Sequence, residues 1–171
     1  RAGENCGPAA PGPRSLGRGG GWCDRRGCRA SPGRQVGTGP GSRARAGVGR
    51  VAVGRPLRGV LEAVGGGAKP GRSFKAVLPG VSNAYIPAAA FDVAVSYEGF
   101  ASIGSGLGSA GFVVCDDTDD LVALTAGASR FLAVESCGQC VPCKQDGLVL
   151  ADLLARLSRS EASPAELETI H

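Results

Sequence analysis

Three cysteines recur at a spacing of three residues in segment 135–143, which reads ESCGQCVPC. Thiolates are the usual ligands of iron–sulfur clusters, and a [4Fe–4S] cluster is normally held by four of them. Cys137, Cys140 and Cys143 can present three thiolates from a single short loop. Gly138 permits the positive φ that such a wrapped loop requires. The spacing therefore favours an iron–sulfur site with Cys137, Cys140 and Cys143 as three of its ligands.

Two other uses of these cysteines stay open. Structural zinc usually takes two Cys-x2-Cys halves that lie far apart in the sequence, and this chain has no second half. The three thiols could also be free or redox-active, although thiols this close pair poorly as disulfides and leave one over. Three further cysteines lie near the start of the chain and do not have the spacing of a metal site. Cys6, Cys23 and Cys28 are therefore interpreted as isolated thiols.

Few other residues can support catalysis. The only histidine is His171, which argues against a histidine-based triad or an internal histidine base. Segment 106–111 has the G-x-G-x-x-G spacing of dinucleotide-binding turns, but it precedes an apolar strand instead of leaving one and opening a helix. The acidic run 116–120 lacks the spacing and glycine of a calcium loop and suits a helix cap. No residue is assigned a catalytic role.

The cysteine loop lies between two predicted helices. The first follows the acidic run, and its predicted buried stripe consists of Leu121, Leu124, Ala128, Phe131 and Leu132. The second begins near Gln145, and its predicted buried stripe consists of Leu150, Leu153, Leu154 and Leu157. A third helix is predicted to start at segment 163–166, because Ser163, Pro164 and Glu166 form the pattern of a capping box.

Upstream of the acidic run, the pattern predicts a short helix and two strands. Apolar residues at helical spacing span residues 57–64, and three glycines follow them. Residues 73–78 alternate as a strand that Pro79 and Gly80 close. Residues 81–100 are expected to be irregular. Residues 111–115 form a buried strand that ends in Cys115, which is interpreted as a core residue.

Composition divides the chain near residue 55. Residues 1–55 carry 11 arginines against Glu4 and Asp24, a net charge of +9, whereas residues 56–171 carry a net charge of −5. Residues 1–54 are rich in Gly, Arg and Pro and poor in large apolar residues, so a disordered or non-native segment is expected. An arginine-rich nucleic-acid-binding arm is the alternative. Base stacking needs aromatic residues, however, and Trp22 is the only one in this segment, so no nucleic-acid partner is expected.

These segments resemble the NADH-binding flavoprotein subunit of NADH:quinone oxidoreductase (respiratory complex I) and its relatives in NAD-reducing hydrogenases and NAD-dependent formate dehydrogenases. ESCGQCVPC resembles the family's cluster loop, and GSGLGSAGFVVCDDTDDLV resembles its glycine-rich strand and acidic helix start. FKAVLPGVS resembles its SLBB (soluble-ligand-binding β-grasp) segment, and PLRGVLEAVGGG resembles the helix before it. The resemblance covers about residues 55–171, with Lys144 where the family usually has arginine.

The resemblance implies an α+β fold in which a small SLBB-like β-grasp domain, residues 55–115, precedes a truncated helical iron–sulfur-binding bundle, residues 116–171. Residues 1–54 are expected to be disordered or non-native. In the family, the loop cysteines bind a [4Fe–4S] cluster, which implies that role for Cys137, Cys140 and Cys143. The family's fourth ligand lies some tens of residues further on. Because the chain contains no methionine, we expect a piece of a longer protein.

The implied function is that of an electron-transfer segment whose cluster accepts electrons from FMN. FMN and NADH are expected only in a missing domain before the SLBB segment, so the chain alone is not expected to oxidise NADH. The implied partners are other subunits of an NADH dehydrogenase-like complex, among them a thioredoxin-like [2Fe–2S] subunit. The implied location is the cytoplasm, or the periphery of the inner membrane through that complex. Direct insertion into a membrane is not expected, because the sequence contains no apolar run of about 18 residues. The alternative is an SLBB-type structural or docking module whose cysteine loop holds zinc or nothing.

Overall fold

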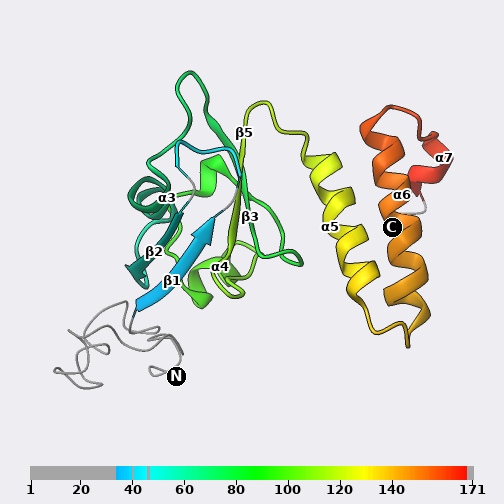
Figure 1. Cartoon of the computed structure of the whole chain (residues 1–171), viewed down its shortest axis with the longest axis horizontal. Coiled ribbons are helices and arrows are strands. Elements are labelled where there is room, and N and C mark those ends of the chain that lie inside the picture. Colours follow the sequence, from blue (N-terminus) through cyan, green and yellow to red (C-terminus); the bar gives the residue numbers. More distant parts are fainter. Residues whose placement is uncertain (1–33, 40, 46, 169–171) are drawn as a thin grey trace. The chain divides into compact units, whose positions relative to one another are not determined.

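The computed structural model describes residues 34–39, 41–45 and 47–168 (Figure 1). The chain divides into two compact units between Asp117 and Thr118. The first unit mixes strands and helices, whereas the described part of the second unit is helical. The predicted α+β class is therefore confirmed. None of the helices in the described residues combines the length and the apolar character of a membrane span.

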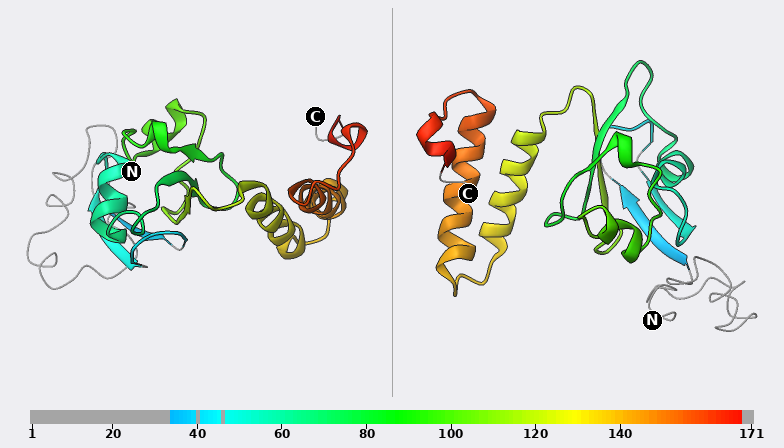
Figure 2. Two further views of the ribbon diagram at one scale, coloured as in Figure 1. Left: turned by 90° about the horizontal axis from the view of Figure 1, so that it is seen from above. Right: turned by 180° about the vertical axis from the view of Figure 1, so that it is seen from behind.

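The first unit is built on a small antiparallel sheet (Figure 2). Its elements in chain order are β1 (Arg34–Gly39), β2 (Gly47–Ala52), α3 (Leu57–Gly65), β3 (Phe74–Pro79), β4 (Ile86–Pro87), the 3-10 turn η1 (Ala88–Ala90), α4 (Tyr97–Ser102) and β5 (Phe112–Asp116). Strand β3 is central, because Val77 pairs with Ile86 of β4 on one side and with Val114 of β5 on the other. Strands β1 and β2 form a separate antiparallel pair.

Most of the predicted elements of the first unit are confirmed. Helix α3 buries Leu57, Val60 and Leu61, as the helical spacing predicts, and Gly66 ends it in the left-handed conformation at φ 72°. Strands β3 and β5 lie within one residue of their predicted bounds. The Cys115 side chain is only 1% exposed, which confirms that it is a core residue.

The prediction that residues 81–100 are irregular is wrong. This segment forms β4, η1 and the start of α4, and its Phe91, Val95 and Phe100 side chains are fully buried in the core. Helix α4 has only six residues, so its sequence contains too few turns for a helical repeat to show. Its start is marked instead by Ser96, whose hydroxyl oxygen accepts a 3.0 Å hydrogen bond from the Gly99 amide.

The prediction that residues 1–54 lack regular structure is wrong for the part of that segment that the structure describes. Strands β1 and β2 lie within it, and Val51 and Val53 are buried. Arg43 is 6% exposed and packs closely against Gly65. A Cβ atom added to Gly65 would lie 2.9 Å from the Arg43 Cδ atom. Main-chain hydrogen bonds to the rest of the unit supply the order that side-chain hydrophobicity could not predict. Residues 1–33 lie outside the described residues.

The second unit is a pair of helices with a short third helix. Its elements are α5 (Leu121–Glu135), the π-helical turn η2 (Pro142–Asp146), α6 (Gly147–Ser158) and α7 (Pro164–Leu167). Asp120 caps α5 as predicted, because its Oδ1 accepts hydrogen bonds from the Val122 and Ala123 amides at 2.8 and 3.1 Å. The other carboxylate oxygen of Asp120 accepts a hydrogen bond from the Ser158 hydroxyl, which joins the start of α5 to the end of α6.

The predicted buried stripe of α5 is wrong. Leu124, Phe131 and Leu132 are 37%, 52% and 40% exposed, whereas the buried residues of α5 are Ala126 and Ala133. Helix α5 instead packs on α6 through small side chains, and a Cβ atom added to Gly147 would lie 3.0 Å from the Ala133 Cβ. Small residues allow two helix backbones to approach closely, so the contact does not follow the most apolar face. The predicted stripe of α6 is confirmed only at Leu153, and Ala151 is the other buried residue of that helix.

Helix α7 is held to α6 by a carboxylate with a lowered pKa. Glu166 forms the predicted capping box with Ser163, and its Oε2 accepts a 2.9 Å hydrogen bond from Arg156 Nη2. The Arg156 hydrogen bond, followed by those from Ser163, lowers the pKa of Glu166 from 4.5 to about 2. The attachment of α7 is therefore complete above about pH 4.5 and is lost as the pH falls toward about 2.

We expect the protection of the Glu166 and Leu167 amides against exchange, relative to the intrinsic rate at each pH, to fall across that acid range, with the Glu166 carboxyl titrating near pH 2 by NMR. In the E166Q variant, the protection of these amides should already be low at neutral pH and should not change across the same range. A Glu166 carboxyl that titrates near its ordinary value of 4.5 would contradict the attachment.

Candidate metal centre

The three cysteines of the loop lie where α5 ends and the next helical segment begins. Helix α5 ends at Glu135, and the Ser136 hydroxyl donates a 2.8 Å hydrogen bond back to the Ala133 carbonyl. Cys137 and Cys140 follow in the non-helical connection, whereas Cys143 lies in the π-helical turn η2. Single π-helical turns are rare and often accompany functional sites.

The loop has the backbone freedom and the exposed thiols that a metal centre needs. Gly138 adopts φ 77°, a left-handed conformation that a side chain would strain, as the sequence predicts. The thiols of Cys137, Cys140 and Cys143 are free and exposed, so no buried contact competes for them. Among the described residues, however, no three histidine, cysteine, aspartate or glutamate side chains are already gathered as a metal site.

The residues present fit an iron–sulfur cluster as three of its four ligands. Three thiol donors stand on one loop, and thiolates are the ligands that such clusters take. Cys115, the other described cysteine, is buried in the first unit, so it is a structural residue and not part of this loop. Cys137, Cys140 and Cys143 would hold the cluster once the loop draws their sulfur atoms together.

Lys144 joins both sides of the cysteine loop. Its backbone amide donates a 3.1 Å hydrogen bond to the Cys140 carbonyl, and its Nζ donates a 2.9 Å hydrogen bond to the Val134 carbonyl in the last turn of α5. Residues 144 and 134 are ten positions apart, so no local helical pattern indicates this bond. The only feature of the sequence that pointed to Lys144 is its position directly after the third cysteine.

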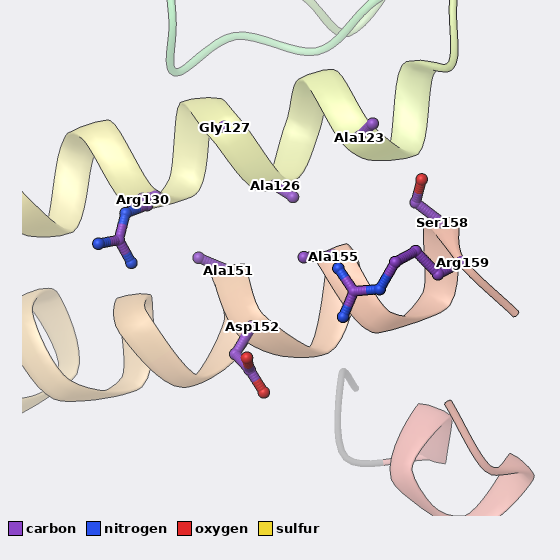
Figure 3. Close-up of a pocket in the computed structure, with 9 residues that line it drawn as sticks. All are labelled: Ala123, Ala126, Gly127, Arg130, Ala151, Asp152, Ala155, Ser158 and Arg159. Carbon is purple, nitrogen blue, oxygen red and sulfur yellow. The ribbon is translucent and has the colours of Figure 1, made fainter. Parts of the chain in front are cut away.

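A groove of about 340 Å³ lies between α5 and α6 of the second unit (Figure 3). Alanine side chains of both helices point into it, and charged side chains stand at its edge. Its lining residues are Ala123, Ala126, Gly127, Arg130, Ala151, Asp152, Ala155, Ser158 and Arg159. Arg159 pairs with Glu161 at 2.8 Å, and no cysteine lines the groove, so it is separate from the metal-site residues.

The glycine-rich segment 106–111 has a structural role. It leads into β5 and does not open a helix, as the order of segments in the sequence predicts. A Cβ atom added to Gly106 would lie 2.6 Å from Asn83 Oδ1, and Asn83 Nδ2 donates a 2.6 Å hydrogen bond to the Pro79 carbonyl. Gly106 is therefore needed for close packing against Asn83.

A sequence model of the family described as the NADH-ubiquinone oxidoreductase-F iron-sulfur binding region matches residues 123–171. The match includes the whole cysteine loop, α6 and all but the first two residues of α5. Residues 123–171 are therefore similar to that iron–sulfur binding region.

Longer relatives extend the similarity beyond the binding region. The chain is 35% identical over 154 residues to the F 2 subunit of the NADH-quinone oxidoreductase of Rhizobium meliloti (strain 1021), an alignment that covers 90% of this chain and 37% of the relative. It is 33% identical over 150 residues to the HndC subunit of the NADP-reducing hydrogenase of Solidesulfovibrio fructosivorans, which covers 87% of this chain and 31% of that relative. The chain thus spans between 31% and 37% of the length of these two relatives.

A solved structure shares the fold. The chain superposes on part of an NAD+-reducing [NiFe]-hydrogenase in the H2-reduced state with a TM-score of 0.74 and 24% identity, covering 91% of this chain and 26% of that one.

The 154-residue alignment with the Rhizobium relative is longer than segment 55–171, so the sequence similarity extends into residues 1–54. The expectation that the family resemblance begins near residue 55 is therefore wrong, and the described part of that first segment is continuous with the fold.

Proposed function

We propose that this chain is an electron-transfer segment of an NADH dehydrogenase-type flavoprotein subunit, in which Cys137, Cys140 and Cys143 bind a [4Fe–4S] cluster. The observation that supports it most strongly is the position of three exposed cysteines on one loop, inside the residues that match the family's iron–sulfur binding region. Such a cluster supplies a site for one electron at a time.

The contribution of the chain is to hold and surround the cluster. Gly138 lets the loop turn, and helices α5 and α6 fix the two ends of the loop. Backbone N–H groups of the loop that donate to sulfur raise the reduction potential of a cluster, and exposure to water also alters it. The described residues assign no acid–base step to any side chain, so the proposal concerns electron transfer alone.

The remaining elements of the proposal follow from the resemblance. Residues 55–115, together with the strands β1 and β2 before them, belong to an SLBB-like β-grasp domain, and residues 116–171 form part of a helical cluster-binding domain. FMN and NADH bind in a domain that precedes the SLBB segment in the family. The relatives are subunits of larger oxidoreductases by name, so partner subunits are expected, among them a thioredoxin-like [2Fe–2S] subunit. The expected location of the assembly is the cytoplasm or the periphery of the inner membrane.

Metal analysis of the chain purified without oxygen tests the proposal. After reconstitution with ferrous and ferric iron, sulfide and a small thiol that can complete the ligand set, we expect about four iron and four sulfide per chain. Broad visible absorption from thiolate-to-iron charge transfer should accompany them. Zinc without sulfide would overturn the proposal in favour of a structural zinc loop on a docking module. A chain that binds neither metal would favour a docking module with an empty loop.

A further inference from the structure

Lys144 is bonded on both sides of the cysteine loop. Its ammonium donates to the Val134 carbonyl at 2.9 Å, and its backbone amide donates to the Cys140 carbonyl at 3.1 Å. The last carbonyl groups of a helix lack intrahelical partners, and a cation near them is favoured by the helix dipole. The lysine therefore satisfies a free end of α5 while it anchors the segment that carries Cys143.

These two hydrogen bonds restrict the conformations that the cysteine loop can adopt. Cys137 lies two residues after the end of α5, and Cys143 immediately precedes Lys144. A tie between Lys144 and the last turn of α5 holds the two outer cysteines near the same helix end. Cluster binding must order the loop, and a loop whose ends are already joined loses less conformational entropy when it closes.

We propose that Lys144 is a positioning residue of the cluster loop, which keeps Cys137 and Cys143 within reach of one cluster and places a positive charge beside it. This inference rests on the proposed function for the cluster itself. The attachment of Lys144 to α5 exists without any metal, so the positioning role can also be measured on the metal-free chain. Residues that orient metal ligands typically change metal affinity by about 10- to 100-fold when they are replaced.

The K144M variant separates the ammonium from the apolar stem of the side chain. In the metal-free chain, we expect its affinity for Cd²⁺, followed by thiolate-to-cadmium absorption, to fall by about tenfold. In the reconstituted chain, we expect iron loss to a chelator to be about tenfold faster. The reduction potential of the cluster should become more negative, because the added electron loses a nearby positive charge. K144R, which keeps a charged donor, should restore all three properties to within about twofold of the original values.

The control is K69M, which removes an exposed lysine from the first unit and should change none of these values. Unchanged cadmium affinity in K144M would overturn the positioning role, as would equal loss in K144R and K144M. If the unaltered chain assembles no iron cluster but K144M still binds Cd²⁺ more weakly, the proposed function fails while the role of Lys144 stands. Circular dichroism spectra that match between variants exclude global unfolding as the cause.

Discussion

Replacement of Cys137, Cys140 and Cys143 together by serine is expected to reduce reconstituted iron and sulfide from about four of each per chain to less than about one. Serine hydroxyls do not supply the thiolate ligands that hold such clusters. All three side chains are exposed and free, so the metal-free fold should lose little stability, within about 0.5 kcal/mol. Iron and sulfide analysis gives the first quantity, and urea unfolding of the metal-free chain gives the second.

The matched control is C115A, which removes a buried thiol from the first unit. It should leave the iron and sulfide content unchanged, because Cys115 is buried away from solvent. If the triple variant retained iron, or if C115A lost it, Cys137, Cys140 and Cys143 would not be the ligands. Single serine variants would then show which thiols contribute.

Replacement of Phe100 by alanine is expected to destabilise the first unit by about 3–5 kcal/mol. Phe100 is fully buried in the core, and its ring centroid lies 6.1 Å from that of Phe112 on β5. Its loss removes the contact between α4 and the sheet and leaves a cavity that the surrounding backbone cannot fill. Urea unfolding, read as the loss of amide protection in residues 47–117, measures the change.

Tyr97 provides the control on the same helix, because its side chain is 52% exposed. Y97A should shift the free energy of unfolding by no more than about 0.5 kcal/mol. Equal effects of F100A and Y97A would mean that helix α4 contributes through its backbone alone. If the free energy of unfolding changed as little in F100A as it is expected to change in Y97A, Phe100 would not be part of the cooperative core.

Local patterns predicted the elements whose causes are local. The helical spacing of Leu57, Val60 and Leu61 identified α3, and the alternation before Pro79 identified β3. The cap of α5 by Asp120 and the capping box of α7 also follow from neighbouring residues. Each of these features needs only contacts within a few residues, which the order of amino acids specifies directly.

The strands β1 and β2 could not be predicted from their residue types. Glycine and arginine have little strand preference, and a hairpin of this kind depends on pairing with distant main chain. The Ser42 amide donates a 2.7 Å hydrogen bond to the Val114 carbonyl, more than seventy positions away. A Cβ atom on Gly41 would lie 2.2 Å from that same carbonyl oxygen, so the glycine content that suggested disorder permits this approach.

The sequence by itself determined the chemistry of the candidate site, because three cysteines at a fixed spacing are a property of one loop. The sequence also determined the helix caps of α5 and α7 and the position of strand β3, since the patterns that mark them involve neighbouring residues. Only the tertiary structure decided which face of α5 is buried, where strands β1 and β2 lie and which group Lys144 contacts. These outcomes depend on how closely separate segments approach, and backbone approach is set by small residues and main-chain hydrogen bonds that carry no periodic hydrophobic signal.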